Sequence, residues 1–328
     1  MFGKIELQSR DIDLLRFLGE YKIMSLDNTR YIYGTKTYQE KRIVKLVQHN
    51  YIKRLKHRYI ELGKRGKEYL NEIGVEIKEH CRNENNLERL LVISDIASCL
   101  IKENFNFIPS WNLKNIDEPT TFSRRYIGKL EYYEQDYLVY AIYEGKNDKY
   151  IKSIYYDIRK EQKYRNIMIF TDNIEEILLY EKGFFFGNNN TVIVPYNNYG
   201  KYLVRNNDRI SESIFSRIDE LYGLSESDLK FADFKVNDVN YVVIMPVINM
   251  EKIARIQTFY YANSNVINLI HICIFGLEEY ENTIIEILPY CRYKGLSKEK
   301  IYELLKMYNL DKEGDENELI QNKWSIRK

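Results

Sequence analysis

Apolar residues recur at helical spacing over roughly the first fifty residues of the chain. Ser9 is placed to cap a first helix with a leucine-rich buried side. Ser25 can cap a short second helix, which Gly34 ends with a turn. A third helix is then expected to begin near Thr35 or Thr37. The pattern predicts three consecutive helices at this end of the chain.

The third helix separates apolar from basic side chains when residues are placed at 100° intervals. One arc is apolar and consists of Ile43, Val44, Leu46 and Val47. The opposite arc consists of Tyr38, Lys41, Arg42, Lys45 and His49. Glu40 falls toward the apolar arc, which its place in the first turn makes tolerable because a carboxylate favours the helix dipole there. We therefore expect one packing side and one basic side.

Two short runs about a polar turn follow the third helix. Residues 51–56 and 59–62 read as the strands of a β-hairpin. Its turn and flanks are basic, with Lys53, Arg54, Lys56, His57 and Arg58. A glycine-bounded basic segment, 63–66, then leads into a helix beginning at Lys67. The order helix, helix, helix, hairpin, helix predicts a winged helix-turn-helix domain over residues 1–78.

The remaining chain has a different pattern. Residues 79–106 form a connecting segment, in which residues 87–101 are apolar nearly all round. Such a helix packs either between domains or in a dimer interface, and the pattern fits both. Residues 107–328 are expected to form an α/β domain, which makes the chain α+β overall. No internal repeat is visible in the sequence.

Within that domain, strands and helices alternate. Strands are expected at 137–143, 166–171 and 191–195, and helices at 148–160 and 174–181. The second part contains a hairpin at 231–247, helices at 250–260 and 297–308, and a buried run at 266–274.

Charge is unevenly distributed along a chain of ordinary composition. Its 328 residues have a net charge of +1, with 45% apolar and 30% charged residues. Residues 1–70 contain 16 Lys and Arg against 8 Asp and Glu, a local charge of +8, which leaves −7 for residues 71–328. A basic module on an acidic body is typical of a protein in which only the module approaches phosphate groups.

Element order, local charge and basic residues on both the third helix and the hairpin together favour binding of double-stranded DNA. A basic amphipathic helix alone would indicate only a solvated surface, and a protein-interaction winged helix is the alternative. The expected contacts to DNA are Lys36, Thr37, Tyr38, Lys41, Arg42, Lys45, His49, Lys53, Arg54, Lys56, His57, Arg58, Lys64 and Arg65. We also expect a homodimer, since many such proteins bind two half-sites.

The sequence lacks the residue patterns that metal, nucleotide or relaxase chemistry would need. Cys81, Cys99, Cys273 and Cys291 are isolated, so we expect reduced thiols without a metal or cofactor. The sequence contains neither a phosphate-binding glycine loop nor the His-x-His pair that a relaxase needs beside its tyrosine. Apolar runs are too short to span a bilayer and no signal peptide is recognisable, so the expected location is the cytoplasm, without a membrane partner.

Three stretches resemble the replication-relaxation family of plasmid and mobile-element proteins. They are ELGKRGKEYL, NLERLLVISDIASCLIKE, and YLVYAIYEGKNDKYIKSIYYDIRK leading into NIMIFTD, and they span roughly the first half of the chain. Gly63 stands where such winged helices tend to have Thr. The resemblance implies DNA binding in plasmid replication, maintenance or transfer. We expect the protein to act in replication, transfer (conjugation) or transcription regulation, with replication or transfer proteins as partners. It also implies a second domain similar to a degenerate restriction-nuclease-like fold.

A nuclease of that fold holds Mg²⁺ between two carboxylates, and a nearby Lys orients the attacking water. Glu144 and Lys146 supply the Glu-x-Lys half of the motif. The family tends to have Pro-Asp-Gly before the strand, but this chain reads Tyr-Ile-Gly at 126–128, and Asp136 is the nearest substitute. We therefore expect a DNA-binding protein rather than an enzyme, with Mg²⁺-dependent cleavage as the alternative.

Overall fold

A computed structural model gives the fold of the chain. It describes residues 5–77, 84–100, 105–113, 118–120, 125–132, 135–180, 190–263 and 269–309. Helices and sheets are both present, so the fold is α+β as expected. The chain forms two compact units, Met1–Ile174 with Phe185–Arg205, and Glu175–Phe184 with Asn206–Lys328. Among the described residues, no helix combines the length and apolar character needed to cross a membrane.

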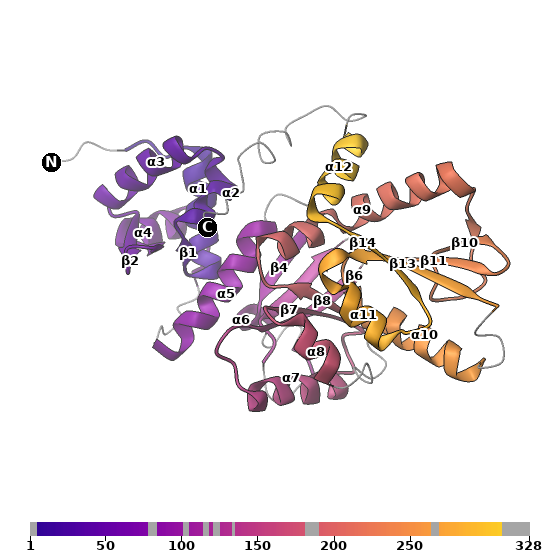
Figure 1. The fold of residues 1–328 in the computed structure, drawn as a ribbon. Coiled ribbons are helices and arrows are strands. Elements are labelled where there is room, and N and C mark those ends of the chain that lie inside the picture. Colours follow the sequence, from indigo (N-terminus) through magenta and orange to yellow (C-terminus); the bar gives the residue numbers. More distant parts are fainter. Residues whose placement is uncertain are drawn as a thin grey trace. The chain divides into compact units, whose positions relative to one another are not determined.

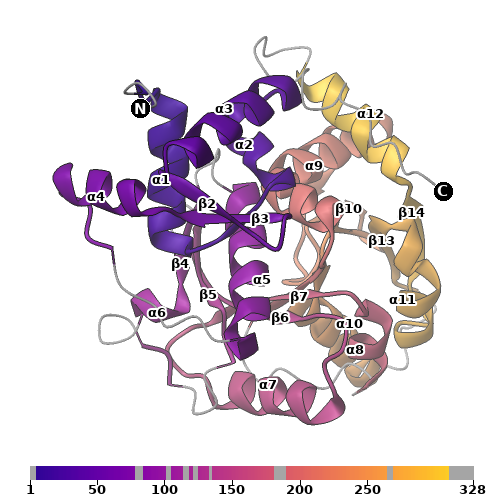
Figure 2. The same ribbon diagram turned by 90° about the vertical axis from the view of Figure 1, so that its left-hand side faces the viewer.

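The N-terminal module (residues 5–77) follows the expected order of elements (Figures 1 and 2). It contains α1 (Ser9–Tyr21), β1 (Met24–Ser25), η1 (Asp27–Thr29), α2 (Arg30–Tyr33), α3 (Lys36–Gln48), β2 (Ile52–Leu55), β3 (Tyr59–Leu62) and α4 (Lys64–Glu72). The short strand β1 was not expected, and it extends the hairpin to a sheet of order β1-β3-β2. The last helix begins at Lys64, earlier than the predicted Lys67.

Two glycines let α4 begin close against the end of α3. A Cβ at Gly63 would lie 2.3 Å from the carbonyl oxygen of Asn50, and one at Gly66 would lie 2.1 Å from that of Tyr51. Both distances are far below van der Waals contact. The Gly63 amide also donates to the Tyr51 carbonyl at 2.8 Å. The glycine-bounded segment is therefore a packing requirement of the module.

The rest of the first unit is built on a mixed sheet. Its strands are β4 (Phe105–Pro109), β5 (Gly128–Tyr132), β6 (Gln135–Ile142), β7 (Asn166–Thr171) and β8 (Asn190–Pro195), with α6 (Ser110–Leu113) after β4. Neighbours follow the order β8-β7-β6-β5-β4. The pairs among β4, β5 and β6 are antiparallel, and β6, β7 and β8 are parallel. Strands β6 and β7 are connected through α7 (Asp148–Lys160). Helix α8 (Ile174–Tyr180) follows β7 in sequence, and all of it except Ile174 belongs to the second unit.

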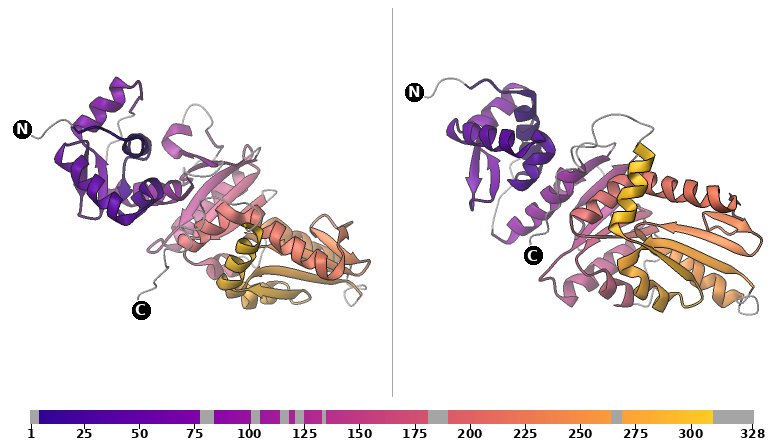
Figure 3. Two further views of the ribbon diagram at one scale, coloured as in Figure 1. Left: turned by 90° about the horizontal axis from the view of Figure 1, so that it is seen from above. Right: turned by 45° about the horizontal axis from the view of Figure 1, so that its top comes forward.

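Helix α5 (Glu84–Leu100) lies between the N-terminal module and this sheet (Figure 3). It packs against α1 and β1 on one side and against β4 on the other. Asn28 of the module donates to Asp95 of α5 at 2.8 Å. Tyr21 donates to the carbonyl of Phe107 at 2.6 Å. Contacts inside the chain therefore account for the apolar pattern of this helix, which needs no second copy to bury it.

The second unit contains another mixed sheet, so residues 107–328 do not form the single α/β domain that was expected. The five strands of this sheet are β9 (Ser225–Glu226), β10 (Phe234–Asn237), β11 (Asn240–Met245), β13 (His271–Leu277) and β14 (Arg292–Leu296). The same stretch of chain also contains β12 (Ile248–Asn249), α10 (Met250–Ala262), η3 (Glu278–Tyr280), α11 (Glu281–Ile287) and α12 (Lys298–Asn309). Helix α9 (Asn198–Tyr222) precedes them, and the division between the units falls within it. The predicted run 266–274 lies partly outside the described residues.

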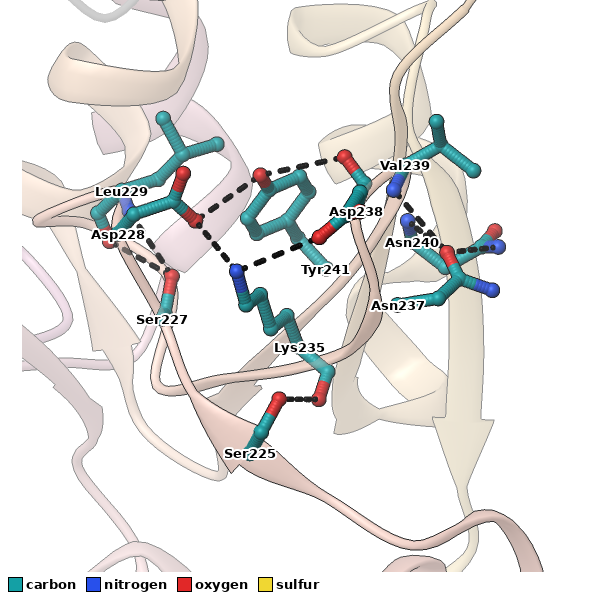
Figure 4. Close-up of polar contacts among 10 residues, drawn as sticks. All are labelled: Ser225, Ser227, Asp228, Leu229, Lys235, Asn237, Asp238, Val239, Asn240 and Tyr241. Carbon is teal, nitrogen blue, oxygen red and sulfur yellow. Dashed lines mark hydrogen bonds and ion pairs between the residues drawn. The ribbon is translucent and has the colours of Figure 1, made fainter.

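The hairpin of β10 and β11 is fixed by side chains at its turn (Figure 4). The Asn237 side-chain oxygen accepts from the backbone amides of Val239 at 3.0 Å and Asn240 at 2.9 Å. Lys235 Nζ lies 3.6 Å from a carboxylate oxygen of both Asp228 and Asp238. This cluster holds the turn and is largely exposed to solvent, so ion pairing adds little to stability there.

The two sheets repeat one topology. Strand order in the second unit is β14-β13-β11-β10-β9, with β9, β10 and β11 antiparallel and β11, β13 and β14 parallel. In both sheets the third strand is followed by a 13-residue helix, α7 or α10, and then by a parallel strand. Each of these helices is capped by an asparagine whose side chain accepts from the amide of the third helical residue. The sequence showed no such repeat.

Individual hydrogen bonds match between the two sheets. The Ile127 amide donates to the Val139 carbonyl at 2.7 Å, and the Asp233 amide donates to that of Val242 at 2.9 Å. Two residues further along each strand, a carbonyl accepts from the third residue of the following helix. In the first sheet Tyr150 Oη donates to the Ala141 carbonyl at 3.3 Å, and in the second sheet Lys252 Nζ donates to the Ile244 carbonyl at 3.0 Å. The repeat is thus kept in backbone register although the side chains differ.

Candidate nucleic-acid interface

The exposed side of α3 is rotated relative to the expected one. Lys36, Thr37, Lys41 and Lys45 are exposed, as a contact to DNA requires. Arg42 was expected beside them, but it is buried. Val44 was expected in the core, but 44% of its surface is exposed. Glu40, the apparent misfit of the apolar arc, is exposed as well, which removes the need for a special explanation.

Arg42 is a structural residue because it neutralises a buried carboxylate. Asp11 of α1 is fully buried, and Arg42 donates to it through Nη2 and through Nε, the latter at 3.2 Å. Arg42 Nη2 also donates to the Glu6 carbonyl at 3.2 Å. The hydrogen bond to Asp11 raises the pKa of Arg42, against the opposing effect of burial. The guanidinium is therefore committed to joining α3 to α1 and is not available to a phosphate.

Tyr38 and His49 are only partly exposed. The Tyr38 hydroxyl donates to the side chain of Gln8, and its ring lies 5.8 Å from that of Tyr33. His49 is the C-cap of α3, where its amide donates to the Lys45 carbonyl at 3.1 Å. Both residues therefore contribute to the structure of the module at the margin of the exposed face.

The β2–β3 hairpin places cations at its tip. Arg54, Lys56, His57 and Arg58 are exposed, whereas Lys53 forms a 2.8 Å ion pair with Glu61 on the adjacent strand. Lys56 and His57 have φ angles of 48° and 59°. Glycine and asparagine reach this left-handed region readily, but other residues pay about 1 kcal/mol or more. The turn therefore keeps basic side chains at a conformational cost.

The start of α4 contributes less than expected. Lys64 is highly exposed, with Glu68 one turn later at 3.9 Å. The Arg65 guanidinium lies 5.1 Å from the centre of the Tyr51 ring, which keeps this side chain partly buried.

On α3 and the β2–β3 hairpin, six exposed cations have no ion pair with another described residue: Lys36, Lys41, Lys45, Arg54, Lys56 and Arg58. Elsewhere in the described part of the module, the same is true of Arg10, Arg16, Arg30 and Lys67. The six cations lie on α3 and on the hairpin that follows it after three residues. Since β2 has four residues, the tip of the hairpin lies about 13 Å along that strand from its first residue. Val44 and Gln48 are also exposed on α3, although neither is among the residues expected to contact DNA.

The candidate nuclease residues are not brought together. Asp136 is the second residue of β6 and lies 3.3 Å from Lys129, whereas Glu144 follows the far end of that strand. At about 3.3 Å per residue, β6 alone separates them by some 20 Å, too far to share one Mg²⁺ ion. Lys146 forms a 2.9 Å ion pair with Glu88. The proposed substitution of Asp136 for the missing carboxylate is therefore wrong.

Within the described ranges, no group of three or more His, Cys, Asp or Glu side chains is arranged to hold a metal ion. Cys99, Cys273 and Cys291 are free thiols, and Cys81 lies outside the described residues. Burial raises the pKa of Cys291 to about 12, which disfavours the reactive thiolate.

No protein-family model matches the chain, and neither a curated protein nor a solved structure is significantly similar to it.

Proposed function

We propose that the N-terminal module is a winged helix-turn-helix that binds double-stranded DNA, with α3 in the major groove and the β2–β3 hairpin against the backbone. The observation that supports this most directly is the group of exposed cations without ion pairs on those two elements. Each such cation can neutralise one phosphate and release a counterion. The conformational cost at Lys56 and His57 also favours a function for the basic turn.

The biological setting is proposed from sequence resemblance alone. We propose that the protein acts in replication, transfer or transcription control of a plasmid or other mobile element. Apart from the four-residue helix α6, the order α5-β4-α6-β5-β6-α7-β7 is compatible with a degenerate restriction-nuclease-like fold in the first unit. The separation of Asp136 from Glu144 argues against cleavage as the function of that fold.

DNA affinity measured against salt concentration tests the proposal. Fluorescence anisotropy with a labelled random-sequence duplex, from about 50 to 200 mM salt, gives the slope of log affinity against log salt. We expect Lys41→Ala and Lys45→Ala each to weaken binding and to reduce that slope by about one. The matched control is Lys152→Ala, an exposed lysine on α7, which should change neither quantity.

Two results would contradict the proposal. Affinity that does not depend on salt, or that is unchanged in Lys41→Ala and Lys45→Ala, would exclude DNA binding by this face. A folded module that binds no duplex at low salt would favour the protein-interaction alternative. Arg42→Ala is unsuitable for this test, because the substitution is expected to destabilise the module and would weaken DNA binding for that reason alone.

A further inference from the structure

The centre of the exposed side of α3 is not basic. At 100° per residue, Thr37, Val44 and Gln48 lie within about 40° of one another, and all three are exposed. Lys41 and Lys45 lie on one flank of this central strip, and Glu40 lies on the other. The lysines are therefore placed to reach one phosphate backbone while the strip faces the base edges.

Val44 is the unusual member of the strip. It is 44% exposed, and its β-branched side chain is a weaker helix former than the lysines and glutamate around it. Single exposed apolar residues are common on protein surfaces, so exposure alone indicates nothing. The informative fact is its position, midway along a helix face otherwise made of polar and charged side chains.

Apolar side chains and glutamine have distinct complements in the major groove. An apolar group contacts the 5-methyl of thymine, and a glutamine amide pairs with N6 and N7 of adenine. Val44 and Gln48 are one helical turn apart, about 6 Å along the axis. Since base pairs are spaced by about 3.4 Å, the two side chains can contact bases one or two steps apart.

We propose that Val44 recognises the methyl group of a thymine and that Gln48 recognises an adenine one or two base pairs away, so that α3 selects an A·T-containing site. This inference rests on the proposed function and deepens it, because it names the base feature that gives specificity. The flanking lysines supply affinity without sequence preference.

Removal of a single methyl group from the DNA tests the inference. Sites are selected from a random duplex library with the full-length protein, and each thymine of an enriched site is then replaced by deoxyuridine. Because a buried methylene contributes about 0.8 kcal/mol, we expect one position at which this change weakens binding about fourfold. In Val44→Ala that discrimination should disappear. Ile73→Ala, which shortens an exposed apolar residue after α4, should retain it.

Each outcome decides something. Selection of no preferred sequence, or equal affinity for thymine and deoxyuridine at every position, overturns the inference while salt-dependent binding still supports the proposed function. Discrimination that persists in Val44→Ala overturns the role of Val44. Absence of any binding to duplex refutes the proposed function and the inference together. Because Val44 is exposed, its replacement should leave the thermal unfolding of the protein unchanged, which a melting curve verifies.

Discussion

The pair of Arg42 and Asp11 makes the sharpest prediction about stability. Asp11 has no exposed surface and accepts hydrogen bonds from Arg42, from the Tyr33 hydroxyl at 2.8 Å and from the Gln8 amide at 2.8 Å. In Arg42→Ala the carboxylate stays buried without its counter-charge. Removing one partner of a buried ion pair costs about 3–5 kcal/mol, far more than an exposed pair would. We therefore expect the backbone amides of α1 and α3 to lose most of their protection against hydrogen exchange.

Hydrogen exchange followed by mass spectrometry measures this loss within the intact chain. A cost of about 3 kcal/mol corresponds to exchange roughly 100-fold faster in the peptides of α1 and α3. Lys41→Ala is the matched control, since Lys41 is exposed on the same helix and should change exchange little.

A double variant separates charge from packing. Asp11→Asn with Arg42→Met removes both charges, retains an acceptor for the Tyr33 hydroxyl, and fills most of the space of the arginine stem. We expect it to be more protected than Arg42→Ala alone. Exchange in Arg42→Ala within a factor of three of the unmodified protein would show that Asp11 is not a buried, charged partner, and the reasoning would fail.

Three further predictions follow from the structure. Gly66→Ala should lower the stability of the N-terminal module by about 1–3 kcal/mol, because its Cβ would lie 2.1 Å from the Tyr51 carbonyl oxygen; unchanged hydrogen exchange in α4 would contradict this. Burial raises the pKa of Tyr31 to about 12 and also raises those of Tyr21 and Tyr33, so the unfolded chain loses these protons first. The contribution of these three tyrosines to the free energy of unfolding is complete below about pH 10 and falls above that pH, by about 1.4 kcal/mol per pH unit for each tyrosine. A urea unfolding midpoint that stays constant from pH 8 to 11.5 would refute this prediction. Supercoiled plasmid should not be nicked faster with Mg²⁺ than without it, and nicking that Glu144→Ala abolishes would restore the nuclease alternative.

Periodicity predicted the order of the elements in the N-terminal module, but not the rotation of α3. Apolar spacing correctly places Leu46 inward, because the periodicity that marks a buried side depends only on residues of the same helix. The burial of Arg42 depends on Asp11, which is 31 residues away in sequence and lies on another helix. In the sequence alone, Asp11 is a carboxylate in the first turn of its own helix, where the helix dipole favours it. Val44 was assigned to the core for the same reason, since its neighbours in space could not be seen.

The second half of the chain shows a similar limit. Alternating strands and helices indicated an α/β arrangement, which the structure shows. Apolar runs do not reveal which sheet a strand joins, so one domain was expected where two sheets exist. The topological repeat was invisible because it is preserved by backbone hydrogen bonds, while equivalent positions bear residues as unlike as Tyr150 and Lys252.

That difference between equivalent positions has a consequence for how the two sheets can vary. Lys252 Nζ lies 2.7 Å from both carboxylate oxygens of Asp233, at the position that Ile127 occupies in the first sheet. A neutral phenol needs no counter-ion, but a half-buried ammonium does. The same backbone arrangement therefore accepts two combinations of side chains, Ile127 with Tyr150 in the first sheet and Asp233 with Lys252 in the second. Replacing Asp233 or Lys252 alone leaves the other as a partly buried charge without its partner, so exchange of one pair for the other requires both positions to change together.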